Sequence, residues 1–159
     1  MTQRSLSRWL KVILGGIGVC GALVYFYMVP YFGKEMLAVY PEFSHCYWPW
    51  LAVIWVSAAP CYLALFYGWK ITVEIGKDHS FSRENAKYLK WISLLAAADS
   101  GYFFAANLAL LLFGMNHPGI FLASLFVEFA GIAIAAVAAA LSHLVQKAAL
   151  IQEENDLTI

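Results

Sequence analysis

Residues 119–145 read GIFLASLFVEFAGIAIAAVAAALSHLV, an apolar run in which Glu128 is the only charged residue. Three similar runs precede it, and Asp99 is the only charged residue inside them. A helix of about 20 predominantly apolar residues crosses a bilayer. The sequence therefore predicts one all-α transmembrane domain covering residues 1–159. We expect an integral membrane four-helix bundle with spans at about 12–31, 47–69, 91–114 and 119–142.

The ten Lys and Arg residues are unevenly distributed between these runs. If the chain crosses the bilayer four times, Lys34 lies on one side and all the others lie on the opposite side. An excess of Lys and Arg marks cytoplasmic loops. We therefore expect a multi-pass protein of the inner membrane with both termini in the cytoplasm, a cytoplasmic loop at 70–90 and a cytoplasmic tail at 143–159. The first run has no small-residue cleavage pattern, so we interpret it as a retained anchor.

Capping and breaking residues predict where the helices begin and end. Gly76 is expected to close the second helix in the left-handed conformation. Ser82 is a predicted N-cap, with Glu84 in the first turn that follows. Helices three and four are then much longer than the bilayer core of about 30 Å, so both should extend into the cytoplasm and form a platform there. Pro60 should kink the second helix, with Ser57 as a candidate partner for the freed carbonyl group.

Small residues recur every four positions on the fourth helix, at Gly131, Ala135 and Ala139. Such a stripe lets a neighbouring helix approach closely. Two interpretations stay open. The stripe packs against another helix of the same chain, or it forms the contact of a homo-oligomer.

Asp99 and Glu128 are the only carboxylates deep inside the runs. A charge at that depth costs at least ~2.5 kcal/mol, and no Lys or Arg is available to pair with it. We expect both side chains to face the interior of the bundle as neutral, hydrogen-bonded carboxyl groups, with partners such as Ser100, Tyr102, Ser124, Tyr62 or Trp55. Three roles stay open, namely structural polar packing, a switch or ligand pocket, and coupling to a proton or cation.

The sequence contains no pattern of an enzyme active site. It has no Ser/His/Asp arrangement, phosphate-binding loop or helical metal-ligand motif. Cys46 and His45 are adjacent, but no second cluster at ligand spacing completes a metal site. We therefore predict a protein that is not an enzyme and has no metal or cofactor. The zero net charge, with basic residues placed at membrane edges, favours no direct nucleic-acid ligand.

Two segments resemble a known family. FSRENAKYLK at 81–90 and ENDLTI at 154–159 resemble the YoaS-like group of bacterial membrane proteins, a family of unknown function with four predicted spans. Members are often encoded beside a small helix-turn-helix regulator of the phage-repressor type. The resemblance thus implies a membrane regulator that binds or sequesters such a cytosolic partner.

The residues that carry this resemblance are the candidate partner-binding residues: Phe81, Ser82, Glu84, Asn85, Glu154, Asn155, Asp156, Leu157, Thr158 and Ile159. They all fall on the predicted cytoplasmic platform. The alternative function is a small proton- or cation-coupled transporter that uses Asp99 and Glu128. A transporter of this kind would depend on the two carboxyl groups and tolerate loss of the tail.

Overall fold

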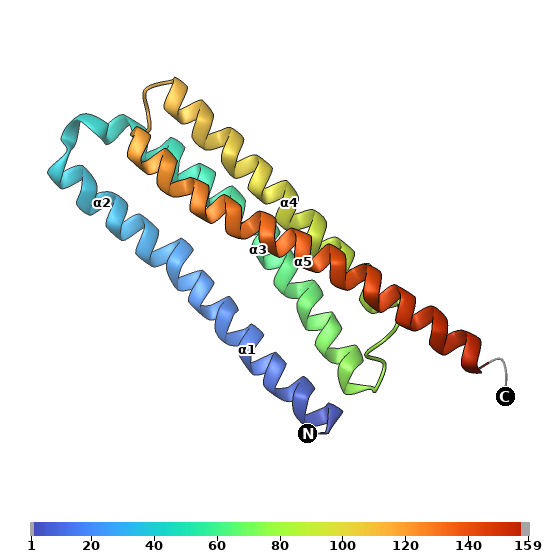
Figure 1. The fold of residues 1–159 in the computed structure, drawn as a ribbon. Coiled ribbons are helices and arrows are strands. Elements are labelled where there is room, and N and C mark those ends of the chain that lie inside the picture. Colours follow the sequence, from blue (N-terminus) through green and yellow to red (C-terminus); the bar gives the residue numbers. More distant parts are fainter. Residues whose placement is uncertain (1, 157–159) are drawn as a thin grey trace.

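The structure is a computed structural model, which describes residues 2–156 and the side chains of residues 2–155. The described chain is all-α (Figure 1). Its first helical segment consists of α1 (Gln3–Leu23), a five-residue π-helical turn η1 (Val24–Met28) and α2 (Val29–Val39). A short 3-10 helix η2 (Pro41–Cys46) follows, and then come the three long helices α3 (Tyr47–Gly76), α4 (Arg83–Leu112) and α5 (Pro118–Asp156).

Four of the helical segments are long and apolar enough to cross a membrane. Each of them is longer than the apolar run that predicted it. The segment Gln3–Val39, for example, has 37 residues. α5 has 39 residues, or about 58 Å at 1.5 Å per residue, against a bilayer core of about 30 Å. Several turns of α5 must therefore lie outside a membrane that the helix crosses.

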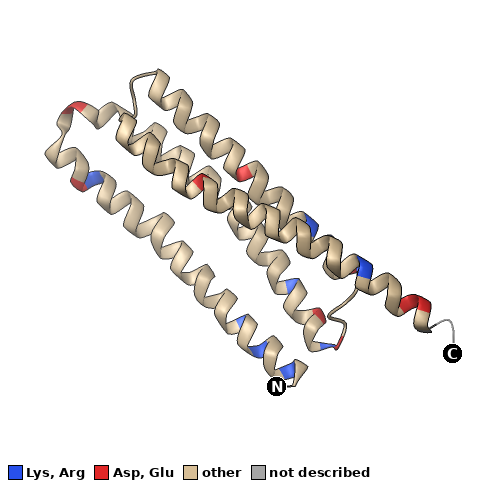
Figure 2. Cartoon of the chain, viewed as in Figure 1, with Lys and Arg blue, Asp and Glu red and all other residues tan. Residues whose placement is uncertain are grey.

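The chain has two distinct ends (Figure 1). The N-terminus, the α3–α4 loop and the last turns of α5 lie together at one end, called here the terminal end (residues 2–11, 70–90 and 143–156). The α2–α3 connection and the α4–α5 loop lie together at the opposite end, called here the distal end (residues 36–50 and 112–120). Figure 2 shows basic residues gathered toward the terminal end. Asp99 lies inside α4 and Glu128 inside α5.

The four long helical segments of the predicted bundle pack in a row and not in a closed ring. α1 packs on α3, α3 packs on α4, and α4 packs on α5. Among the described helices, the backbone of α5 closely approaches that of α4 alone. The physical reason is that these helices are apolar on most sides, and lipid is as apolar as their side chains, so the hydrophobic effect does not drive closure.

Polar side chains instead mark each of the three interfaces. At the α1–α3 interface, the Ser7 hydroxyl donates to the Thr72 carbonyl over 2.6 Å. At the α4–α5 interface, the Ser142 hydroxyl donates to the Ala86 carbonyl over 2.7 Å, and at the α3–α4 interface polar side chains surround Asp99. Because unpaired polar groups are costly in lipid, these bonds select which helices are neighbours.

The small-residue stripe on α5 is used largely inside the chain. A Cβ atom at Gly131 would overlap the hydroxyl group of Ser100 on α4, so any larger residue would force the Ser100 side chain to shift. Ala135 is buried, and its carbonyl accepts a hydrogen bond from the Ser93 hydroxyl over 2.8 Å. Ala139 is exposed. Gly131 and Ala135 therefore pack on α4, which leaves Ala139 as the member of the stripe that faces away.

Two local predictions for α3 need correction. The helix ends at Gly76 as predicted, but the left-handed residue is Asp78, with φ of 66°. Gly76 stays helical and serves a close approach, since a Cβ there would lie 2.8 Å from the Ser7 hydroxyl oxygen on α1. The predicted role of Ser57 is also wrong, because its hydroxyl donates to Asp99 instead of to a carbonyl group freed by Pro60, which lies inside α3.

Candidate functional site

The loop between α3 and α4 is held by one buried amide. Asn85 is 1% exposed, and its Nδ2 donates to the carbonyl oxygens of His79 and Ser80 over 3.1 and 3.0 Å. Ser82 caps α4 as predicted, because its hydroxyl oxygen accepts the Asn85 backbone N–H over 3.2 Å. The first turn of α4 thus fixes both its own start and the loop that precedes it.

An ion pair joins this loop region to the end of α5. The Arg83 guanidinium donates to both carboxylate oxygens of Glu153, with a distance of 2.9 Å from Nε to Oε1. Two parallel bonds of this kind fix geometry as well as charge. The pair raises the pKa of Arg83 through the hydrogen bond and charge of Glu153. Residues 76–90 and 152–156 therefore lie together at the terminal end and form one surface, called here the platform.

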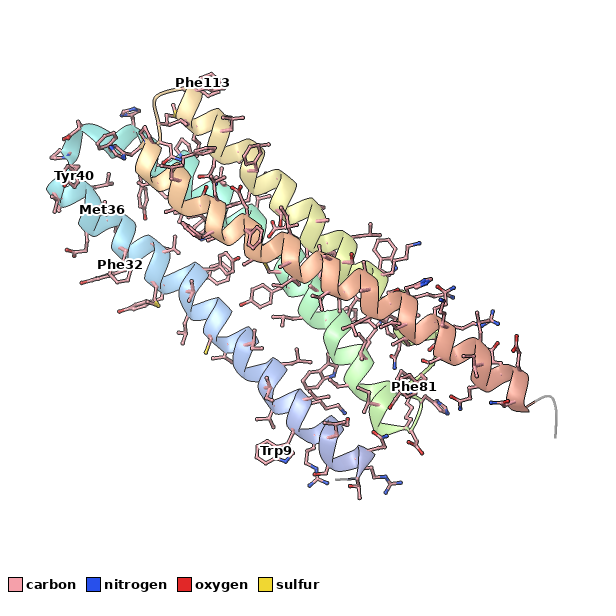
Figure 3. The ribbon with its side chains drawn as sticks, viewed as in Figure 1. Trp9, Phe32, Met36, Tyr40, Phe81 and Phe113 are labelled. Atoms are coloured by element: carbon pink, nitrogen blue, oxygen red, sulfur yellow. The ribbon has the colours of Figure 1, made fainter. Side chains whose placement is uncertain are left out.

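The predicted partner-binding residues take different positions on the platform. Phe81 is 59% exposed, and Glu84, Glu154 and Asn155 are exposed as well. Figure 3 places Phe81 at the terminal end, beside the last turns of α5. Asn85 is buried and Ser82 caps a helix, so these two residues stabilise the platform but contribute little of its exposed surface. The side chain of Asp156 and the residues Leu157, Thr158 and Ile159 lie outside the described residues.

Asp99 is the centre of a polar cluster inside the membrane-spanning region. The Ser57 hydroxyl donates to Asp99 Oδ2 over 3.0 Å, and the Cys61 thiol donates to the same oxygen over 3.6 Å. The Tyr25 hydroxyl donates in turn to the Cys61 sulfur over 3.6 Å. This Asp99 cluster (Tyr25, Ser57, Cys61 and Asp99) links η1, α3 and α4. The other oxygen of Asp99, Oδ1, is buried and has no hydrogen-bond partner among the described residues.

Glu128 lies in a separate polar contact. Its side chain is buried, and its Oε1 lies 3.3 Å from the predicted partner, the Ser124 hydroxyl of the same helix, whose single hydrogen it shares with the Phe121 carbonyl oxygen at 2.8 Å. No hydrogen bond joins Glu128 to Asp99 within residues 2–155. The other four predicted carboxyl partners donate to backbone carbonyl groups: Ser100 to Ala96, Tyr102 to Val53, Tyr62 to Gly18 and Trp55 to Tyr25. The structure thus gives each carboxyl group its own surroundings.

The two partners of Asp99 were missed by the sequence prediction. Ser57 and Cys61 are four residues apart on α3, which places both on one helix face. That spacing was an available signal, although it does not say which helix the face meets. The part of the chain that the structure describes contains no group of three or more His, Cys, Asp or Glu residues that could hold a metal ion.

Comparisons with known proteins identify the family of the chain. A sequence profile described as "Protein of unknown function (DUF2975)" matches residues 31–159, from α2 to the end of the chain. The chain belongs to this family. It is also 29% identical, over 99% of each chain, to "Uncharacterized membrane protein YoaS" of Bacillus subtilis (strain 168). No solved structure matches it. The family identified from residues 81–90 and 154–159 is confirmed, and the chain is a membrane protein.

Proposed function

We propose that this protein is a non-enzymatic membrane regulator whose platform binds a small cytosolic partner, namely a helix-turn-helix transcription regulator. The observation that carries the proposal is the Arg83–Glu153 ion pair, which joins the first family-like segment, at Arg83, to the residue that directly precedes the second. Arg83 and Glu153 are 70 residues apart in the sequence. Two segments that are already held together lose less conformational freedom on binding a partner than two independent segments would.

The proposed orientation places the terminal end, and with it both termini, in the cytoplasm. Of the ten Lys and Arg residues, only Lys34 lies outside the terminal end. The positive-inside rule assigns the side with the excess to the cytoplasm. The helical turns at the start of α4 and the end of α5 then extend beyond the inner surface of the membrane, where a cytosolic protein reaches them.

The chemistry of the platform suits a basic partner. Phe81 offers an exposed aromatic anchor, and we expect Leu157 and Ile159 to add apolar contacts. Glu154 and Asp156 supply negative charge near the end of α5, beyond Glu153, whose carboxylate is paired with Arg83. A DNA-binding partner carries a basic surface for phosphate groups, and the same surface would meet these acidic residues. Binding would therefore compete with DNA, which is how a membrane protein sequesters a regulator.

A matched pair of phenylalanines tests the proposal. Phe81 and Phe113 are both exposed, but they lie at opposite ends of the molecule (Figure 3). We expect Phe81→Ala, and separately deletion of 157–159, to reduce co-purification of a helix-turn-helix regulator encoded beside the gene and to change transcription of neighbouring genes. Phe113→Ala should change neither. If both platform variants behave as wild type in both measurements, the proposal fails.

The second candidate function is a proton- or cation-coupled transporter, favoured by the unpartnered Asp99 Oδ1. Buried polar groups inside membrane spans mark ion paths in many transporters. This function predicts that reconstituted vesicles acidify or take up cations, and that Asp99→Asn and Glu128→Gln abolish the flux. Under the regulator proposal, the same two variants leave co-purification of the partner unchanged. Wild-type vesicles that show no such flux would exclude this second candidate, and flux that survives both substitutions would exclude a role of the two carboxyl groups in it.

A further inference from the structure

A large apolar cavity opens at the distal end, far from the platform. Its volume is about 820 Å³, which lies in the range of about 300–1,000 Å³ typical of small-molecule sites. Along η1 and α2, residues spaced by three and four positions line it from Val24 to Tyr40. The 16 helical steps from Val24 to Tyr40 span about 24 Å at 1.5 Å per residue. The cavity is therefore long enough to hold an extended chain.

The opposite wall comes from α3 and from the α4–α5 loop. Trp50, Leu51 and Ile54 of α3 line the cavity, and so do Asn116 and His117 of the loop. The lining extends farthest from the distal end at Val24 on η1 and at Ile54 on α3. The cavity thus runs from the distal end inward along the membrane-spanning part of the helices, where it is lined mainly by hydrocarbon side chains.

Two hydrogen-bond donors remain available at the distal end of this cavity. The Gly119 backbone N–H donates to His117 Nδ1 over 3.0 Å, so Nδ1 is an acceptor and the neutral imidazole carries its hydrogen on Nε2. The indole N–H of Trp50 has no partner among the described residues, although indole groups of this kind normally find one. Both donors belong to elements at the distal end, namely the first turn of α3 and the loop before α5.

We infer that this cavity binds the acyl chain of a lipid whose head group accepts hydrogen bonds. The acyl chain would lie along α2 toward Val24, and the carboxylate or ester oxygen atoms would accept the N–H groups of Trp50 and His117. The apolar length, the position in a membrane-spanning chain and the donors at the distal end all match this single class of ligand. Free fatty acids and phospholipids share this chemistry, and the experiment below distinguishes them.

Two residues of α2 provide the test and its control. Met36 lines the cavity and is 54% exposed, while Tyr31 is 52% exposed and does not line it. A tryptophan at position 36 should fill the space that the chain occupies. We expect purified protein in nanodiscs to bind radiolabelled palmitate saturably, with affinity reduced about tenfold in Met36→Trp by steric overlap and unchanged in Tyr31→Trp.

Competition identifies the source of the chain. Unlabelled palmitate that displaces the label, where dipalmitoyl phosphatidylglycerol does not, identifies a free fatty acid, and displacement by both identifies a phospholipid. His117→Asp keeps a cap acceptor for α5 but removes the donor, so it should weaken palmitate binding by about tenfold, as expected when a carboxylate loses a partner and gains a like charge. Wild-type binding that never saturates, or that is equal in both tryptophan variants, would overturn the inference. Native mass spectrometry that finds a second copy in place of lipid would overturn it as well.

Discussion

Replacing Asn85 by Ala should loosen the α3–α4 loop without unfolding the spans. The substitution removes two hydrogen bonds, from Nδ2 to the carbonyl oxygens of His79 and Ser80 at 3.1 and 3.0 Å. Each bond contributes about 0.5–1.5 kcal/mol net, or about 1–3 kcal/mol together. The better helix propensity of alanine returns about 0.5 kcal/mol. The net loss of loop stability is therefore about 0.5–2.5 kcal/mol.

Hydrogen exchange measures this loss directly. Amide exchange of a locally opening segment follows its opening equilibrium, and 1.4 kcal/mol corresponds to a factor of ten, so residues 77–82 should exchange about two to sixty times faster. Asn85→Asp should have a larger effect, since a carboxylate cannot donate and would face two carbonyl oxygens. The exposed Asn155→Ala is the matched control and should exchange like the wild type. Unchanged exchange of the loop in both Asn85 variants would show that this amide does not hold it.

Three further predictions concern the spans. Gly131→Leu should lower the melting temperature in detergent, because the new side chain overlaps Ser100 and overpacking costs about 1–3 kcal/mol, whereas Ala139→Leu should melt like the wild type. Cysteines placed at Lys34 and Lys77 should label from opposite sides of the membrane in intact cells, and labelling of both from outside would contradict the proposed orientation. Infrared spectra at neutral pH should show protonated carboxyl bands that disappear in Asp99→Asn and Glu128→Gln, and carboxylate bands from both residues would refute their neutral state.

Local signals in the sequence predicted the local features of the fold. Ser82 followed by Glu84 predicted the start of α4, and the structure has this cap. Long apolar runs predicted four spans, and four helical segments of the described chain are long and apolar enough to cross a membrane. The turn after α3 was only partly predicted, because the choice between Gly76 and Asp78 depends on contact with Ser7 from α1. A feature that depends on contact with another helix cannot be predicted from the sequence of one segment alone.

The order in which helices pack could not be predicted for the same reason. The side chains of α3 and α5 are apolar on most faces of each helix, so the periodicity of the sequence does not predict which face contacts a neighbouring helix. The bond from Ser57 to Asp99 depends on how α3 and α4 are rotated, and the Arg83–Glu153 pair joins residues that are 70 positions apart. These contacts could be identified only from the structure.

The π-helical turn η1 connects two features that are otherwise separate. Its wider winding places Tyr25 so that the backbone carbonyl accepts the Trp55 indole N–H over 3.0 Å, while the hydroxyl donates to Cys61 in the Asp99 cluster. The neighbouring Val24 lines the distal cavity. Such turns often occur at functional sites, since they redirect side chains at little cost to the helix. Among the described long helices, α1 packs only on α3. Within the first span, η1 is therefore the segment that contacts both the Asp99 cluster, through Tyr25, and the distal cavity, through Val24.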